Sequence, residues 1–268
     1  MLGALIGLTG GIFGGLVGLG GGVVMVPMLV GLARLRQQEA HGTSLVAVVF
    51  AGMAGAATYA SRGAVDLSGA ISLAATATLT ARQGARHAHA LPEWKLKRAF
   101  GAFLLAVSLL LLARPWLAGQ AAPLEGWAKA AVLLPVGAVT GFLSGMMGVG
   151  GGNMMVPAMV LLAGFAQVIA QGTSLLAMVP AGLVGSHTHW RLGNVRRGLL
   201  PGMAAGILLG AFLGGSVALR LPEMALRLAF AAVLIWTGLR YVRAPRPAAP
   251  PGGDGARGTP AGHEPRPY

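Results

Sequence analysis

Long apolar stretches alternate along this chain with short polar or basic segments. Eight apolar segments cover residues 2–33, 41–60, 67–90, 99–113, 132–163, 171–189, 198–219 and 228–242. A helix needs about 20 apolar residues to cross the hydrocarbon core of a membrane, and several of these segments reach that length. The pattern therefore predicts an all-α polytopic membrane protein.

The two halves of the chain carry the same motifs at a constant offset of 130 residues. The segment GLTGGIFGGLVGLGGGVVMVPMLV at 7–30 returns as GAVTGFLSGMMGVGGGNMMVPAMV at 137–160, and HGTSL at 41–45 returns as QGTSL at 171–175. We divide the chain into repeat one (1–114), a linker (115–130), repeat two (131–243) and a Pro/Gly-rich tail (244–268) that we expect to be disordered. Duplicated halves with Gly/Pro-interrupted apolar segments are typical of transporters whose substrate binds at the repeat interface.

The first apolar segment of each repeat is too long for one straight crossing, because about 30 helical residues measure roughly 45 Å. Both segments contain a glycine run, at Gly18–Gly22 and Gly148–Gly152, and glycine destabilises a helix interior. We predict two half-helices joined by an unwound glycine turn. The alternative is a long tilted helix whose glycines allow close packing.

Basic residues predict the orientation of the repeats. They follow the first segment of repeat one at Arg34 and Arg36, whereas in repeat two they lie between the second and third segments, at Arg191, Arg196 and Arg197. If basic loops are cytoplasmic, the repeats are inverted, and each has a re-entrant broken helix plus about three spanning helices. This predicts a multi-pass protein of the inner (plasma) membrane with a cytoplasmic C-terminus. Parallel repeats with four crossings each are the alternative.

Composition restricts the chemistry. Hydrophobic residues make up 55% of the chain and charged residues 10%, with a mean hydropathy of +0.70, whereas a soluble domain carries about 25% charged residues. The net charge of +13 comes from residues between apolar segments, and no nucleic-acid recognition motif accompanies it, so we expect no nucleic-acid partner. The absence of cysteine excludes thiolate sites, and we predict neither a metal nor a cofactor.

The glycine turns indicate where a ligand binds, because irregular backbone inside a membrane persists only when buried in protein or lining a cavity. Each turn precedes a half-helix whose first amides and dipole favour an anion. The predicted substrate-binding residues are Gly20, Gly21, Gly22, Thr43, Ser44, Gly150, Gly151, Gly152, Asn153, Thr173 and Ser174. The alternative is that these glycines serve packing and that the polar side chains cap or bridge helices.

Three further residues are predicted to act in coupling or gating. His187 and His189 could relay protons, and Arg86 could neutralise an anion near the cytoplasmic face. The alternative is that they anchor helix ends at the interface. No carboxylate lies deep in an apolar segment, which argues against cation transport.

These motifs resemble the TauE/SafE family of sulfite and organosulfonate exporters, over about residues 3–242. The resemblance rests on the two glycine-rich segments with their following prolines, and on Gly172-Thr173-Ser174-Leu175, Gly193-Asn194-Val195 and Gly84-Ala85-Arg86. It implies transport of sulfite, sulfoacetate, thiosulfate or a similar anion.

We therefore predict a secondary transporter of a small anion, not an enzyme, that alternates access between its repeats within a lipid bilayer. A passive anion channel, or a carrier of a non-sulfur anion, is the main alternative. An intramembrane hydrolase using Ser44, Ser144 or Ser174 with His187, and a purely structural membrane protein, are further alternatives. The sequence leaves a homodimer open.

Overall fold

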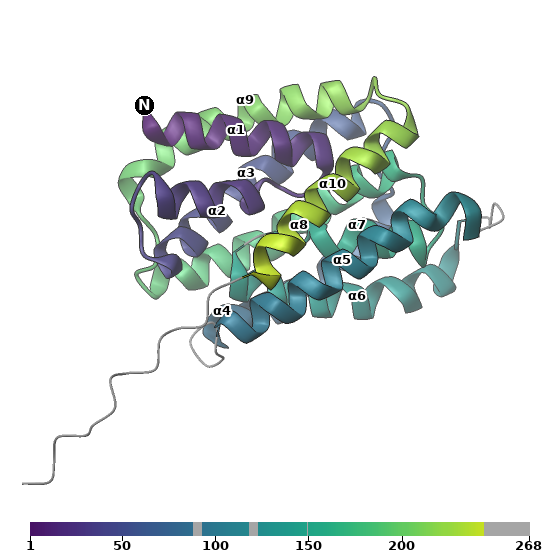
Figure 1. The fold of residues 1–268 in the computed structure, drawn as a ribbon, viewed down its shortest axis with the longest axis horizontal. Coiled ribbons are helices and arrows are strands. Elements are labelled where there is room, and N and C mark those ends of the chain that lie inside the picture. Colours follow the sequence, from purple (N-terminus) through teal and green to yellow (C-terminus); the bar gives the residue numbers. More distant parts are fainter. Residues whose placement is uncertain (88–92, 118–122, 149, 244–268) are drawn as a thin grey trace, which may run out of the picture.

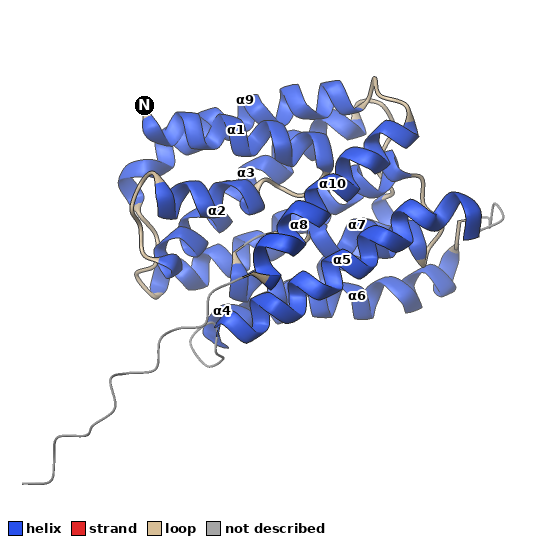
Figure 2. Ribbon diagram, viewed as in Figure 1, coloured by secondary structure: helices blue, strands red, loops and turns tan. Residues whose placement is uncertain are grey.

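The computed structural model describes residues 1–87, 93–117, 123–148 and 150–243, and every regular element in these ranges is helical (Figure 2). The tail predicted to be disordered lies outside them. The helices are α1 (Leu2–Val17), α2 (Gly22–Gly31), α3 (Gln37–Ala60), α4 (Leu67–His87), α5 (Glu93–Leu117), α6 (Gly126–Met147), α7 (Gly152–Leu161), α8 (Gln167–Arg191), α9 (Leu200–Ala218) and α10 (Glu223–Val242), with a 3₁₀ turn η1 (Arg197–Leu199) before α9 (Figure 1).

The predicted interruption of each first segment is confirmed. In repeat one the helix stops at Val17 and restarts at Gly22, and in repeat two it stops at Met147 and restarts at Gly152. The intervening backbone is left-handed at Gly18, Gly20, Gly21, Gly148 and Gly150, with φ between 61° and 85°. Only glycine adopts this conformation readily, which explains the glycine runs.

The two half-helices of repeat one fold back on each other (Figure 1). Thr9 Oγ1 lies 3.3 Å from Met28 Sδ, and a Cβ added to Gly14 would overlap the backbone nitrogen of Gly21. The contact between Thr9 and Met28 lies further from the break, on both sides, than the contact between Gly14 and Gly21. The helices α1 and α2 therefore run antiparallel and form a hairpin. At 1.5 Å per residue they measure about 24 Å and 15 Å.

The repeats are interleaved rather than separate. α1 packs on α9, and its counterpart α6 packs on α4, while α3 pairs with α8 and α5 with α10. Individual bonds recur at the same offset: Tyr59 Oη donates to Gly15 O at 2.9 Å, and His189 Nε2 lies 2.9 Å from Gly145 O. The fold therefore has an approximate two-fold axis that exchanges the repeats.

Helices related by this axis run in opposite directions. Along α3 and α8, Gly52 lies against the Leu175 carbonyl, whereas Leu45 lies against Gly185. In the pair α5 and α10, the ring of Phe100 is 6.2 Å from that of Tyr241, and Leu105 contacts Gly238. Both pairs are antiparallel, so the approximate two-fold axis is perpendicular to these helices rather than parallel to them.

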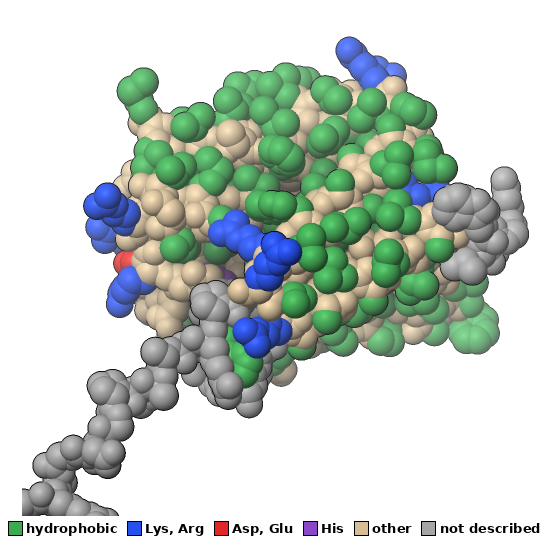
Figure 3. Space-filling view, viewed as in Figure 1, with side chains coloured by type: hydrophobic (Ala, Val, Ile, Leu, Met, Phe, Trp, Pro, Cys, Tyr) green, Lys and Arg blue, Asp and Glu red, His purple; other side chains and the backbone are tan. Residues whose placement is uncertain are grey.

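Five helical segments in the described ranges are long and apolar enough to cross a membrane: α3, α6, α8, Arg197–Ala218 and α10. Large apolar side chains are exposed on them and their neighbours, among them Leu79, Leu109, Leu209 and Phe212. Figure 3 shows apolar side chains over α1, α9 and α10, with Lys and Arg at the edges and at the C-terminal end of α10. A surface of this kind is suited to lipid.

One ion pair joins the start of α4 to α6. Lys129 Nζ lies 2.9 Å from Asp66 Oδ2, and the Lys129 side chain is only 12% exposed. Burial alone would raise the pKa of Asp66, but Lys129 and the bonds from Gly69 N and Ser68 Oγ hold that pKa below its ordinary value. The carboxylate therefore stabilises the fold at neutral pH.

Asp66→Asn is expected to destabilise the protein by about 2–4 kcal/mol, because Lys129 loses its counter-ion while Asn still caps α4. The stabilisation exists above the unfolded pKa near 4 and disappears as pH falls through the lower folded pKa. Thermal unfolding in detergent should therefore show an acid-dependent loss below about pH 4 in the wild type that is reduced in the variant. Asp66→Asn with Lys129→Met should recover part of the loss; no recovery would contradict the ion-pair account.

Candidate functional site

The two glycine breaks lie against each other at the centre of the fold. A Cβ added to Gly152 would lie 2.5 Å from the Gly18 carbonyl oxygen, and one added to Gly150 would lie 2.8 Å from the Leu19 carbonyl oxygen. All four residues are buried. The substrate residues predicted from the glycine runs are thus brought to one place.

The predicted serines hold these breaks. Ser44 Oγ donates to Gly148 O at 2.8 Å, and Ser174 Oγ donates to Gly18 O at 2.7 Å. Each serine is fully buried and reaches the break of the opposite repeat.

The predicted threonines bond to connecting segments. Thr43 Oγ1 accepts a hydrogen bond from Arg196 N, and Thr173 Oγ1 accepts one from Asp66 N, both at 2.9 Å. Both threonines are fully buried. As with the serines, the bonds join one repeat to the main chain of the other.

Ser174→Ala is expected to lower the stability of the protein by about 1 kcal/mol, because the Gly18 carbonyl loses its hydroxyl donor, with little change in anion affinity. Thermal unfolding and anion titration of the purified variant check this, with Ser186→Ala, whose hydroxyl bonds only within α8, as the control. A large loss of affinity without loss of stability would instead place the hydroxyl on the substrate.

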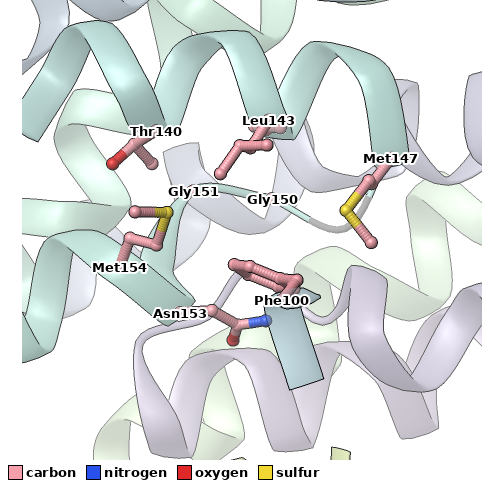
Figure 4. A pocket seen from close by; sticks show the side chains of 9 residues that line it. Phe100, Thr140, Leu143, Met147, Gly150, Gly151, Asn153 and Met154 are labelled. Carbon is pink, nitrogen blue, oxygen red and sulfur yellow. The ribbon is translucent and has the colours of Figure 1, made fainter. Parts of the chain in front are cut away.

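A small cavity opens beside the break of repeat two. It has about 230 Å³ of empty space, including the part open to solvent. It is lined by Phe100, Thr140, Leu143, Ser144, Met147, Gly150, Gly151, Asn153 and Met154 (Figure 4). Only about 10 Å³ of this space admits the centre of a water-sized sphere, which is room for about one water molecule.

Asn153 is the polar side chain that sets this cavity apart. It is 2% exposed, and neither its Oδ1 nor its Nδ2 has a hydrogen-bond partner. Leaving a buried polar group unpaired destabilises a fold by about 1–3 kcal/mol, and such groups call for an explanation. Asn153 lies in the first turn of α7, where the helix amides and dipole also favour negative charge.

The equivalent place in repeat one is apolar. Val23 stands where repeat two has Asn153, and Gly14 stands where it has Ser144. The backbone differs as well, since Gly21 has φ +81° whereas Gly151 has φ −85° and lies with its N 3.1 Å from Met178 Sδ. The polar cavity therefore breaks the two-fold symmetry.

A larger groove lies between α2 of repeat one and the C-terminal end of α10. It has about 1510 Å³ of empty space, including the part open to solvent, and is lined by Val26, Pro27, Val30, Gly31, Gln37, Trp236, Leu239, Arg240, Tyr241 and Arg243. The basic side chains near the end of α10 in Figure 3 belong to this region. Gln37 connects the groove to the interior, because its Nε2 lies 2.9 Å from His41 Nε2.

The predicted coupling residues do not gather in one site. Arg86 and His187 are exposed at the ends of α4 and α8. His189 is buried, at 1% exposed, with its Nε2 2.9 Å from Gly145 O.

Sequence reasoning missed the apolar lining of the cavity, from Phe100, Leu143 and Met147. Thr140 and Ser144 carried a usable signal, because repeat one has Gly10 and Gly14 in their places. Polar residues of one repeat that align with glycines of the other indicate an asymmetric site.

Comparison with known proteins places this fold in a family. The family model described as "Sulfite exporter TauE/SafE" matches residues 3–241. The chain belongs to the TauE/SafE family. This confirms the resemblance noted in the sequence.

The curated relatives that the chain matches are named probable membrane transporter proteins. The chain is 28% identical to the probable membrane transporter protein YunE of Bacillus subtilis, over 89% of this chain and 95% of that one. It is 30% identical to a probable membrane transporter protein of Xylella fastidiosa strain Temecula1, over 80% and 84%. No solved structure matches significantly. The protein is a multi-pass membrane transporter.

Proposed function

We propose that this TauE/SafE protein is a secondary transporter that carries a small sulfur oxyanion or organosulfonate by alternating access between inverted repeats. The observation that carries the proposal is Asn153, buried with its amide unpaired in a cavity at the start of α7. We place the protein in the plasma membrane with its C-terminus on the cytoplasmic side.

The antiparallel pairs support the inversion. α3 and α8 are both long and apolar enough to cross a bilayer, they are equivalent in the two repeats, and they run in opposite directions. If both cross the membrane, the axis that relates the repeats lies in the membrane plane. The hairpin of α1 and α2 supports the re-entrant form, since it enters and leaves on the same side.

The cavity lining supports an anion with an apolar or soft part. The amides that begin α7, Asn153 Nδ2 and the Ser144 hydroxyl are uncharged donors for oxyanion oxygens. Phe100, Leu143 and Met147 add apolar side chains to the same lining, and the methionine sulfur is polarisable. Thiosulfate and short sulfonates combine oxyanion oxygens with a soft or apolar part, whereas sulfate carries oxygens only.

The predicted substrate-binding residues fall into two groups: some contact the anion, and the others hold the glycine breaks in place. We propose that Gly150, Gly151, Gly152 and Asn153 contact the anion. Gly20, Gly21 and Gly22, with the Thr and Ser residues of both repeats, shape and hold the breaks. Motion of one repeat against the other would then open the cavity to either side.

Thermal unfolding of the detergent-purified protein with sulfite, thiosulfate, sulfoacetate, taurine, sulfate, lactate and nickel tests the substrate class. Ligand at 100 times its Kd stabilises the folded state by about 2.7 kcal/mol, so sulfur oxyanions should raise the unfolding temperature. Stabilisation by lactate or nickel alone would overturn the sulfur assignment.

Counterflow in proteoliposomes separates a carrier from a passive channel. A carrier accelerates uptake of labelled thiosulfate when unlabelled thiosulfate is inside, and its rate saturates. The confined cavity supports this outcome; uptake that rises linearly without counterflow would favour the channel.

A further inference from the structure

The two repeats differ in a second buried pair of side chains. In repeat one, Tyr59 Oη donates to Gly15 O at 2.9 Å and lies 3.1 Å from Gln171 Oε1. The residues equivalent to Tyr59 and Gln171 are His189 and His41. The Tyr–Gln pair on one side of the axis is therefore matched by two histidines on the other.

Both histidines are buried against the break of repeat two. His189 and His41 are 1% and 6% exposed. A Cβ added to Gly42 would lie 3.1 Å from His189 Cβ, and one added to Gly148 would lie 2.6 Å from His41 Cα. The chain at His41–Gly42 thus touches both His189 and the glycine break.

The hydrogen bond of His189 fixes which of its nitrogens can take a proton. Nε2 lies 2.9 Å from the Gly145 carbonyl oxygen, which only accepts, so Nε2 carries the hydrogen and Nδ1 the lone pair of the neutral ring. Gly145 is in the last turn of α6, where the helix dipole favours a cation. Ser144 and Met147 of the same turn line the anion cavity.

His41 is buried and adjoins Gly42, whose backbone packs against His189. Other titratable or charged groups lie on α8, on the segment after it, and on the helices packed against α8. Those with described side chains are Arg36, Glu39 and Tyr59 on α3, Arg82, Arg86 and His87 on α4, Lys129 on α6, Glu223, Arg227, Arg240 and Tyr241 on α10, and His187, Arg191, Arg196 and Arg197. Those on α4 are exposed, and Lys129 and Arg227 are paired with Asp66 and Glu223.

We propose that the His41–His189 pair is the coupling-ion site of the transporter and binds one proton together with each anion. Two neighbouring imidazoles disfavour a second charge, so the pair takes up a single proton. The proton comes from water through the groove, whose lining residue Gln37 contacts His41, and binds Nδ1 of His189 without breaking the bond to Gly145. It leaves to water on the opposite side when the carrier reorients.

The proposal rests on the anion site of the proposed function. An imidazolium beside the last turn of α6 attracts an anion in the cavity lined by that turn. Because linkage is reciprocal, anion binding must then draw a proton onto the pair, and anion affinity must rise as pH falls from about 8 to 5. In repeat one the Tyr–Gln pair does not titrate in this range.

The test uses His41→Gln/His189→Tyr, which recreates the pair that repeat one already holds, in the full-length purified protein. Thiosulfate and isethionate are the probes, because both stay fully ionised over this pH range. We measure their affinity between pH 5 and 8, and proton uptake on binding in weakly buffered solution with an indicator dye. His187→Gln, two residues away and exposed, is the matched control.

The wild type and His187→Gln should take up about one proton per bound anion, with affinity that rises at least tenfold toward pH 5, while the double variant should bind with a pH-independent Kd and no proton uptake. Persistence of both effects in the double variant would overturn the proposal, as would their absence in the wild type. Anion binding without proton uptake removes the coupling site alone. Failure of the wild type to bind any anion removes the proposed function itself.

Discussion

Asn153→Val is expected to abolish anion binding and at the same time to stabilise the ligand-free protein. The change removes the only donor side chain of the first turn of α7, and it also removes a buried amide without partners. Relief of that desolvation should raise the free energy of unfolding by about 1–3 kcal/mol. Valine fits, because Val23 occupies the equivalent position in repeat one at 4% exposed.

Thermal unfolding with and without thiosulfate measures both effects in one experiment. The variant should start at a higher unfolding temperature and show no shift with the anion. Val23→Asn is the mirror control: it should destabilise the protein by a similar amount and leave the anion shift intact. An Asn153→Val protein that is less stable, or that binds thiosulfate with wild-type affinity, would contradict the assignment of the site.

Gly21→Ala is expected to prevent stable folding. Gly21 has φ +81°, and a Cβ there would overlap the carbonyl oxygen of Gly10 across the α1–α2 hairpin. A left-handed alanine costs roughly 1–2 kcal/mol, and the overlap with rigid backbone adds to it, so the total should exceed about 4 kcal/mol. The yield of monodisperse protein in detergent and its unfolding temperature report the loss.

Gly63→Ala separates the two causes. Gly63 has nearly the same φ, +68°, but nothing lies within 4 Å of an added Cβ. This control should lose only about 1–2 kcal/mol and remain well folded. Equal losses in the two variants would mean that backbone conformation, rather than the contact between half-helices, makes glycine necessary at the break.

The sequence predicts the helices and the breaks well because both depend on local properties. The breaks fall at the glycine-rich segments before Gly22 and Gly152, whereas the pairs Gly10-Gly11 and Gly14-Gly15 stay within α1. Apolar segments long enough for a membrane form helices. The duplication also indicates which parts meet, since Gly18–Gly22 and Gly148–Gly152 recur at one offset and lie together in the fold.

The roles of individual side chains depend on packing and could not be predicted in the same way. Thr43 and Ser44 look like ligand donors in sequence, yet their oxygens bond to the main chain of the opposite repeat. Phe100 reaches the cavity from α5, with no local signal of its own. His187 and His189 differ by two positions on one helix, and only the fold shows that one is exposed and the other buried.

The bonds from Ser44 to Gly148 and from Ser174 to Gly18 have a consequence for how the protein is made. During synthesis the glycine turn of repeat one leaves the ribosome long before Ser174 is translated. It must therefore enter the membrane before the Ser174 hydroxyl can donate to the Gly18 carbonyl. The first half therefore cannot reach its final conformation until the second half has been inserted beside it. Two separately expressed halves should each be prone to degradation, and should be rescued only when both are present in the same membrane.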